Sequence, residues 1–160
     1  MQPEAIAVDP LAIAIERAVP DAIVGANVTV DGPVLEIAPA FITAVGRHLR
    51  DSGFERVSGI TGVDWWPRSP RFEVVYLLHS VRHNQRVRLT VRLGEEQELD
   101  SLTSVWRGAN WYEREVFDLF GVRFRNHPNL ERIMMPADWE GHPLRKDYPI
   151  HGYKYSYQDE

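Results

Sequence analysis

The chain has 160 residues, 44% of them hydrophobic and 26% charged, which is the composition of a globular protein with the length of one domain. Its formal net charge of −5 argues against nucleic acid as a partner. The sequence has no cysteine, so disulfides, iron–sulfur ligation and thiol chemistry are excluded for this chain.

The sequence predicts neither a targeting segment nor a membrane span. Residues 1–16 lack a positively charged leader region and carry acidic side chains early, unlike a secretory signal peptide. The longest unbroken apolar run, Val74–Leu78, is far shorter than the roughly 20 residues that cross a bilayer. We therefore expect a protein that is soluble by itself.

The first third of the chain predicts two helices with a pair of strands between them. Asp9 followed by Pro10 is typical of a helix start, because the carboxylate caps the helix and proline suits its first turn. Residues 31–33, Asp-Gly-Pro, indicate a turn between two strands. Gly53 marks the end of the second helix. The four elements are expected at 10–19, 27–30, 34–37 and 39–52.

The middle of the chain predicts three longer strands and a short helix, at 56–65, 72–80, 85–93 and 101–106. The strand 72–80 is apolar on both faces, which places it inside the sheet rather than at an edge. Asn84 tolerates the dihedral angles of a hairpin turn after this strand. The order α-β-β-α-β-β-β indicates an α+β fold, with a mostly antiparallel or mixed sheet and helices on one face.

The stretch Trp111–Pro149 begins with a short amphipathic helix. Glu113, Glu115 and Asp118 fall on its polar arc, and Arg114 stands four residues before Asp118, a spacing that lets the two pair. Gly121 follows the last apolar residue, where a left-handed C-cap stops a helix.

The segment after this helix is rich in proline and yet carries large apolar side chains. Prolines forbid a long helix or a central strand, so the segment should run extended. Its apolar side chains, Trp139 among them, need a cover that the segment itself does not supply. We therefore divide the chain into a globular domain, 1–120, and an extended C-terminal partner-binding arm, 121–160. The prolines are Pro128, Pro136, Pro143 and Pro149.

This region and the strands before it also carry a resemblance to a known family. The matching segments are ITGVDWW (60–66), RFEVVYLLHS (71–80), ANWYERE (109–115), ERExxD (113–118), GVRFRNHPNL (121–130), RIMMP (132–136) and DWEGHPLRKDYP (138–149). In this order they resemble the C subunit of the proton-translocating NADH–quinone oxidoreductase (respiratory complex I) and the corresponding plastid, cyanobacterial and hydrogenase-associated subunits. Glu131 departs from the pattern, because the family usually has a basic residue there.

The resemblance implies a non-catalytic subunit in the peripheral arm of a membrane-associated enzyme. Electrons would pass from NADH through flavin and iron–sulfur clusters in partner subunits to quinone, coupled to proton translocation. This chain would hold no cofactor. It would scaffold the large quinone-site subunit beside a neighbouring iron–sulfur subunit, on the cytoplasmic side of the bacterial plasma membrane.

The resemblance also implies a subunit interface on the helix and the arm. Its expected residues are Glu113, Arg114, Glu115, Asp118, His127, Arg132, Trp139, His142, Pro143, Leu144, Arg145, Lys146, Asp147 and Tyr148. By residue type alone, the carboxylates 113–118 fit either acid–base catalysis or a solvated helix face, and the solvated face is favoured. The family relation favours a buried, paired cluster instead.

Two other groups of residues, the histidines of the arm and a row of arginines, lack the pattern of a functional site. His127, His142 and His151 lack the tight spacing of a metal-ligand pair, so no metal is predicted, and the first two precede proline at turn positions. Strand 85–93 carries a row of arginines on one face. Without interleaved stacking aromatics, this row is interpreted as solvated or subunit-facing rather than as a nucleic-acid site. Glycine-rich phosphate loops do not occur in the sequence.

The sequence leaves two alternatives open. One is the equivalent subunit of a ferredoxin- or F420-dependent quinone or phenazine reductase, or of a membrane-bound hydrogenase. The other, from a different class, is a free-standing protein-interaction domain.

Overall fold

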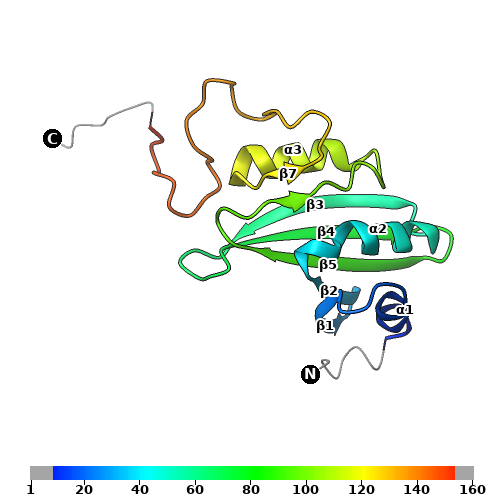
Figure 1. Cartoon of the computed structure of the whole chain (residues 1–160). Helices are drawn as coiled ribbons and strands as arrows, with labels where there is room; N and C mark the ends of the chain where they lie inside the picture. The colour runs from blue at the N-terminus through cyan, green and yellow to red at the C-terminus, as the bar shows by residue number, and fades with distance from the viewer. Residues whose placement is uncertain (1–8, 154–160) are drawn as a thin grey trace.

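The computed structural model describes residues 9–153, and Figure 1 shows their path. The expected order α-β-β-α-β-β-β and the α+β class are confirmed. The elements are α1 (Pro10–Ala18), β1 (Ile23–Thr29), β2 (Gly32–Ile37), the 3-10 turn η2 (Pro39–Phe41), α2 (Ile42–Asp51), β3 (Arg56–Asp64), β4 (Phe72–Ser80), β5 (Gln85–Leu93), β6 (Leu99–Asp100), α3 (Ala109–Phe120) and β7 (Phe124–Arg125).

Five strands form one mixed sheet in the order β1-β2-β5-β4-β3. β2 runs parallel to β5, and the other neighbouring pairs are antiparallel. β4 lies between β5 and β3, inside the sheet as its apolar character predicts. Asn84 in the β4–β5 hairpin has a positive φ of 49°, which asparagine tolerates in a tight turn.

Local chemistry explains where the helices begin and end. α1 begins as predicted, because Asp9 Oδ1 accepts a hydrogen bond from the N–H of Leu11 at 2.9 Å. α3 ends at Gly121, whose φ of 80° is the left-handed conformation of a C-cap. The predicted helix at 101–106 is wrong. These residues form turns, in which the N–H groups of Val105 and Trp106 both donate to the oxygen of Leu102, and so short a segment does not propagate as a helix.

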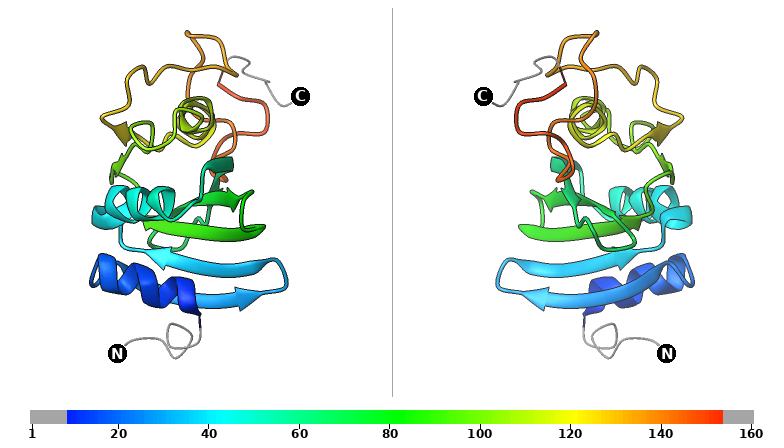
Figure 2. Two further views of the ribbon diagram at one scale, coloured as in Figure 1. Left: turned by 90° about the vertical axis from the view of Figure 1, so that its right-hand side faces the viewer. Right: turned by 90° about the vertical axis from the view of Figure 1, so that its left-hand side faces the viewer.

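The helices cover one face of the sheet. Phe72, Val74, Tyr76 and Leu78 point from β4 into this core, and none is more than 2% exposed. Figure 2 shows α1 and α2 over this face. α3 packs at the β3 side, where a Cβ added at Gly62 would lie 2.7 Å from the Phe120 ring. Among the described residues no helix covers the opposite face.

The first residues after α3 still pack in the core of the globular domain. Val122 and Phe124 belong to the hydrophobic core, at 3% and 4% exposed. β7 pairs in parallel with β6, a contact that the sequence reading missed because both strands have two residues. The rest of the arm, as far as it is described, runs through turns and bends round the side of α3 away from the sheet (Figure 2).

Candidate subunit interface

One carboxylate near the end of α3 holds the first part of the arm. Asp118 has no exposed surface, and its Oδ2 accepts hydrogen bonds from the N–H groups of Ile133, Met134 and Met135 at 3.0, 2.6 and 2.9 Å. Its Oδ1 accepts from Arg132 Nη1 at 2.9 Å. Burial by itself raises the pKa of Asp118, but these donors outweigh burial and hold that pKa below its usual range. Asp118 is therefore a buried anion that fixes residues 132–135.

The predicted pairing of Arg114 with Asp118 is wrong, because Asp118 faces the arm. Arg114 donates from Nε to the backbone oxygen of Glu131 at 3.0 Å, and its guanidinium lies 4.8 Å from the centroid of the Trp111 ring. The contact at Glu131 uses the main chain, so an acidic residue at this position leaves it intact.

The second part of the arm caps the end of α3. The last carbonyls of a helix have no partner within the helix and need donors from elsewhere. Here the arm supplies them, because His142 Nδ1 donates to the oxygen of Asp118 at 2.8 Å and Arg145 Nε donates to that of Phe120 at 2.7 Å. The N–H of Leu144 donates to Leu119 at 3.0 Å. Arg145 also places a cation at the negative end of the helix dipole.

The far end of the arm is tied to the sheet by a buried arginine. Arg71 is 6% exposed and donates from Nε and Nη2 to the two oxygens of Asp64, at 3.0 and 2.9 Å. The same guanidinium binds Asp147 and Glu95. The N–H of Lys146 adds a bond to Asp64 Oδ2 at 2.9 Å. Burial opposes ionisation of Asp64, but these donors lower its pKa to about 2.

Glu113 is buried by this chain's own groups. It is 0% exposed, and its carboxylate accepts from Ser101 Oγ at 2.6 Å and from the N–H of Leu102 at 2.7 Å. Burial raises the pKa of Glu113 to about 7, because two donors are too few to offset desolvation. Neither Glu113 nor Asp118 has exposed surface that a partner could contact. We therefore no longer include them in the proposed interface.

The histidines of the arm are hydrogen-bonded, as their position before proline indicates. His127 Nδ1 accepts from the N–H of Asn129 at 3.0 Å, so Nε2 carries the proton and donates to the oxygen of Asn110 at 3.2 Å. Burial lowers the pKa of both His127 and His142, which keeps these imidazoles neutral near pH 7. Within residues 9–153 no three acidic or histidine side chains converge as a metal site.

The other expected interface residues reach solvent to different degrees. Glu115, Leu144, Lys146 and Asp147 are exposed, although Asp147 is bound to Arg71. The half-buried ones are Arg114, Arg132, Trp139, His142, Pro143, Arg145 and Tyr148, together with His127, whose side chain itself has no exposed surface. Apolar side chains outside the expected interface set are also exposed on α3 and the arm: Trp111 at 63%, Met134 at 57% and Ile150 at 98%.

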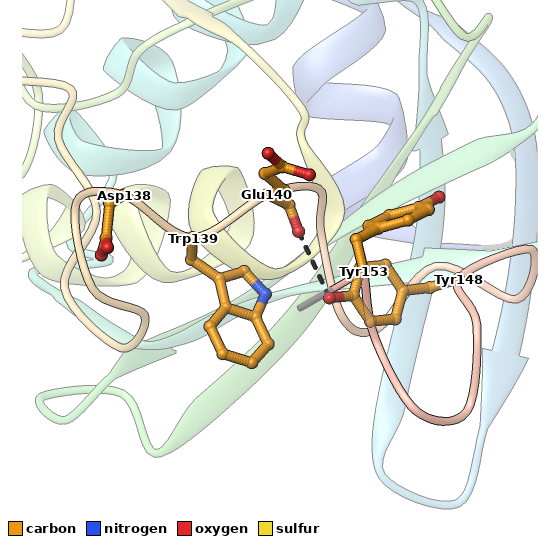
Figure 3. Close-up of a pocket in the computed structure, with 5 residues that line it drawn as sticks. All are labelled: Asp138, Trp139, Glu140, Tyr148 and Tyr153. Atoms are coloured by element: carbon orange, nitrogen blue, oxygen red, sulfur yellow. Dashed lines mark hydrogen bonds between the residues drawn. The ribbon is translucent and has the colours of Figure 1, made fainter. Parts of the chain in front are cut away.

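The arm also encloses a cavity of about 230 Å³, lined by Asp138, Trp139, Glu140, Tyr148 and Tyr153 (Figure 3). The Tyr148 hydroxyl donates to the backbone oxygen of Glu140 at 3.2 Å, and its ring meets that of Tyr153 edge to face, with centroids 5.3 Å apart. The indole nitrogen of Trp139 is buried and has no hydrogen-bond acceptor among the described residues. This N–H needs an acceptor, which water or another molecule can supply.

Reading the sequence missed Asp64 and Arg71, although both lie inside the matched segments ITGVDWW and RFEVVYLLHS. No local pattern marks the pair of Arg71 with Asp147, because Asp147 lies 76 residues from Arg71 along the chain. No helix in the described range is both long and apolar enough to cross a membrane.

Comparison with known proteins gives a consistent result. The family model described as "Respiratory-chain NADH dehydrogenase, 30 Kd subunit" matches residues 35–154. The chain is 44% identical over 151 residues to the NADH-quinone oxidoreductase C subunit of Paramagnetospirillum magneticum, covering 91% of this chain and 76% of that one. It is 47% identical over 133 residues to the mitochondrial "NADH-ubiquinone oxidoreductase 30.4 kDa subunit" of Neurospora crassa, covering 81% and 47%.

Two solved structures share the fold. A trypsin-resistant fragment of Nqo5 matches with a TM-score of 0.58 and 33% identity, covering 61% of this chain and 82% of the fragment. A chain of an archaeal membrane-bound sulfane sulfur reductase, described as a respiratory membrane complex, matches with a TM-score of 0.74 and 25% identity, covering 85% and 82%. By family model, sequence identity and fold, this chain belongs to the family of NADH-quinone oxidoreductase C subunits, the 30 kDa subunits of respiratory-chain NADH dehydrogenase.

Proposed function

We propose that this chain acts as a non-catalytic scaffold in the peripheral arm of an NADH:quinone oxidoreductase, and that residues 121–160 form its partner-binding arm. The observation that carries the proposal is the two-sided character of the arm. Its inner side is fixed to α3 by Asp118, His142 and Arg145. Its outer side presents large apolar groups, with Leu144 51% exposed and Met134 57% exposed.

The partners follow from the family and from this geometry. We propose that the arm is covered by the large quinone-site subunit, beside a neighbouring iron–sulfur subunit, and that the chain is peripheral to the membrane on its cytoplasmic side. Exposed apolar side chains on a rigid frame are typical of obligate interfaces, whose buried core is depleted in charge. The contact set is now centred on Trp111, Met134, Leu144 and Ile150, with Glu115 and Lys146 as charged neighbours.

The redox chemistry is assigned to other subunits. A chain without cysteine cannot ligate iron–sulfur clusters through thiolates, and its sequence offers no glycine-rich phosphate loop for a flavin or nicotinamide nucleotide. Flavin and clusters would therefore lie in the partners, with quinone as the substrate of the complex. The shared name of the relatives supports NADH as donor and quinone as acceptor, and we propose proton translocation as the coupled process.

Assembly of the complex tests the proposed interface. Leu144→Asp places a charge on the outer side of the arm, and Val24→Asp is the matched control on β1, where the valine is 55% exposed. A tagged chain carrying Leu144→Asp should recover at least about tenfold less of the other subunits from membranes, since a buried charge in an interface costs more than 1.4 kcal/mol. Val24→Asp should assemble normally, and both purified variants should unfold at the temperature of the unchanged chain. Equal assembly of the two variants would refute the interface.

The scaffold role has its own test. The purified chain should show no visible absorbance and no NADH-dependent reduction of a dye or a quinone. Turnover by the homogeneous chain would overturn the non-catalytic role while leaving the interface proposal standing.

A further inference from the structure

The face of the sheet opposite the helices carries a groove of about 280 Å³, remote from the arm. It lies between the β1–β2 turn and the adjoining ends of β4 and β5. Its lining includes Pro33, Val34, Leu77, His79, Arg86 and Arg88. Figure 2 shows that no helix or arm segment of the described chain lies over this end of the sheet.

The floor of the groove is apolar. Val34, Arg88 and Leu77 are register neighbours across β2, β5 and β4, and Gly59 of β3 continues the row. Because Gly59 has no side chain, Leu77 stays uncovered on that side and is 38% exposed. A sheet face that lacks a second layer leaves such apolar surface for another molecule to bury.

The wall of the groove is cationic and unpaired. Arg86 and Arg88 contact no carboxylate among the described residues, and the Nε2 atom of His79 is buried without a hydrogen-bond partner. Arg92, further along the same strand, differs: it pairs with Glu73 at 3.2 Å and its guanidinium lies 5.1 Å from the centroid of the Trp65 ring. Of the three arginines on β5, the two without an ion pair therefore line the groove, where Asp31 is the one acidic lining residue.

We propose that this groove is a second docking site, which takes an acidic protein segment carrying an apolar side chain. The apolar side chain would cover Leu77 and Val34, and neighbouring carboxylates would pair with Arg86 and Arg88. Guanidinium groups bind carboxylates through paired hydrogen bonds, which gives direction as well as attraction. A protein segment is favoured over an anionic membrane surface, because the net charge of −5 repels such a surface as a whole.

Titration of the isotopically labelled full-length chain tests the proposal by nuclear magnetic resonance. The probe is the peptide acetyl-Glu-Leu-Glu-Leu-amide, and its matched control is acetyl-Gln-Leu-Gln-Leu-amide. Inorganic phosphate and phosphatidylglycerol vesicles distinguish a small-anion site and a membrane surface. We expect the acidic peptide to shift the amide signals of residues 77–79 and 86–88 in a saturable manner, and to do so less at high salt, because screening weakens exposed charge pairs.

Substitutions then locate the site. Arg86→Glu together with Arg88→Glu should weaken binding at least about tenfold, because the reversed charges repel the peptide. Arg47→Glu, on the exposed side of α2, is the matched control and should bind normally. The amide spectrum of each variant shows in the same experiment whether its fold is kept. Equal shifts with the glutamine peptide or with phosphate, stronger binding of the vesicles, or no saturable shift would overturn the proposal.

Discussion

Helix α3 buries two carboxylates, and the structure shifts their pKa values in opposite directions. Asp118 receives a guanidinium bond and three backbone N–H bonds, and its pKa lies below the usual range despite burial. Glu113 receives one hydroxyl and one N–H, and burial raises its pKa to about 7. Both side chains have no exposed surface, but Glu113 lies deeper in the protein, so stronger desolvation and fewer donors together raise its pKa above that of Asp118.

The two carboxylates also differ in what they organise. Glu113 ties α3 to the turn at 101–102, inside the globular domain. Asp118 ties α3 to residues 132–135, in the arm. The family motif that contains both acids therefore serves two structural tasks, and substitutions should separate them.

Asp118→Asn should produce the largest effect. The amide carries no charge for Arg132, and its nitrogen cannot accept the hydrogen bonds that one carboxylate oxygen now receives. Breaking a buried charge pair from one side costs about 3–5 kcal/mol, which here should appear as release of the arm. Urea unfolding and the rate of tryptic cleavage after Arg145 and Lys146 measure it. Asp138→Asn, at an exposed carboxylate of the same arm, is the control, and equal behaviour of the two would contradict the role of Asp118.

Glu113→Gln should change how stability depends on pH near neutrality. The folded-state pKa of about 7 lies above the reference value of 4.5, so the folded state favours the protonated acid. Its stabilising contribution is complete below pH 4.5 and is lost as pH rises through 7, by about 3 kcal/mol. The unchanged chain should therefore lose stability relative to Glu113→Gln between these pH values. Parallel curves of unfolding free energy against pH would contradict the raised pKa.

Asp64 should make stability fall as the pH is lowered, the opposite direction to Glu113. Its folded-state pKa of about 2 lies below the reference value of 3.8, so its contribution is present above pH 3.8 and is lost as pH falls through 2. The loss should be about 2 kcal/mol. Asp64→Asn should reduce this loss of stability at low pH, whereas Glu113→Gln should leave it unchanged. A loss of the same size in Asp64→Asn would show that Arg71 does not hold this carboxylate ionised.

Glu115 provides the smallest effect on stability, because it lies on the same helix but is exposed. Glu115→Gln should change the free energy of unfolding by less than about 0.5 kcal/mol. Its effect, if the residue faces a partner, should appear as weaker recovery of the other subunits in the assembly assay. A large loss of stability in the isolated chain would place Glu115 in the same class as Asp118.

Much of the sheet could be predicted from sequence because its signals are local. The apolar character of 72–80 on both faces, the alternation along 85–93 and the turn residue Asn84 were enough to find β4, its hairpin and β5. The ordered motifs were enough to find the family. The start of β1 at Ile23 was missed, since Gly25 and Asn27 interrupt its apolar pattern.

The hydrogen bonds and ion pairs that hold the arm could not be predicted, because the paired residues are distant along the chain. Arg71 and Asp147 are separated by 76 residues and Asp118 and Met134 by 16, which no periodicity reveals. The expectation of one polar arc was wrong for Glu113. With 3.6 residues per turn, Glu113 lies between Phe117 and Phe120 on the helical wheel and nearly opposite Glu115. Asp118 does lie beside Glu115, and only the loop that packs against this side of α3 buries it.

Amide hydrogen exchange of the isolated chain tests most directly whether the arm is fixed by α3 before a partner arrives. The N–H groups of Ile133, Met134 and Met135 are bonded to Asp118, and that of Leu144 is bonded to Leu119. We expect all four to exchange far more slowly than exposed amides, and the three that are bonded to Asp118 to lose this protection in Asp118→Asn. Exchange at the rate of an unstructured peptide in the unchanged chain would contradict the account, because the arm would then become ordered only on the partner.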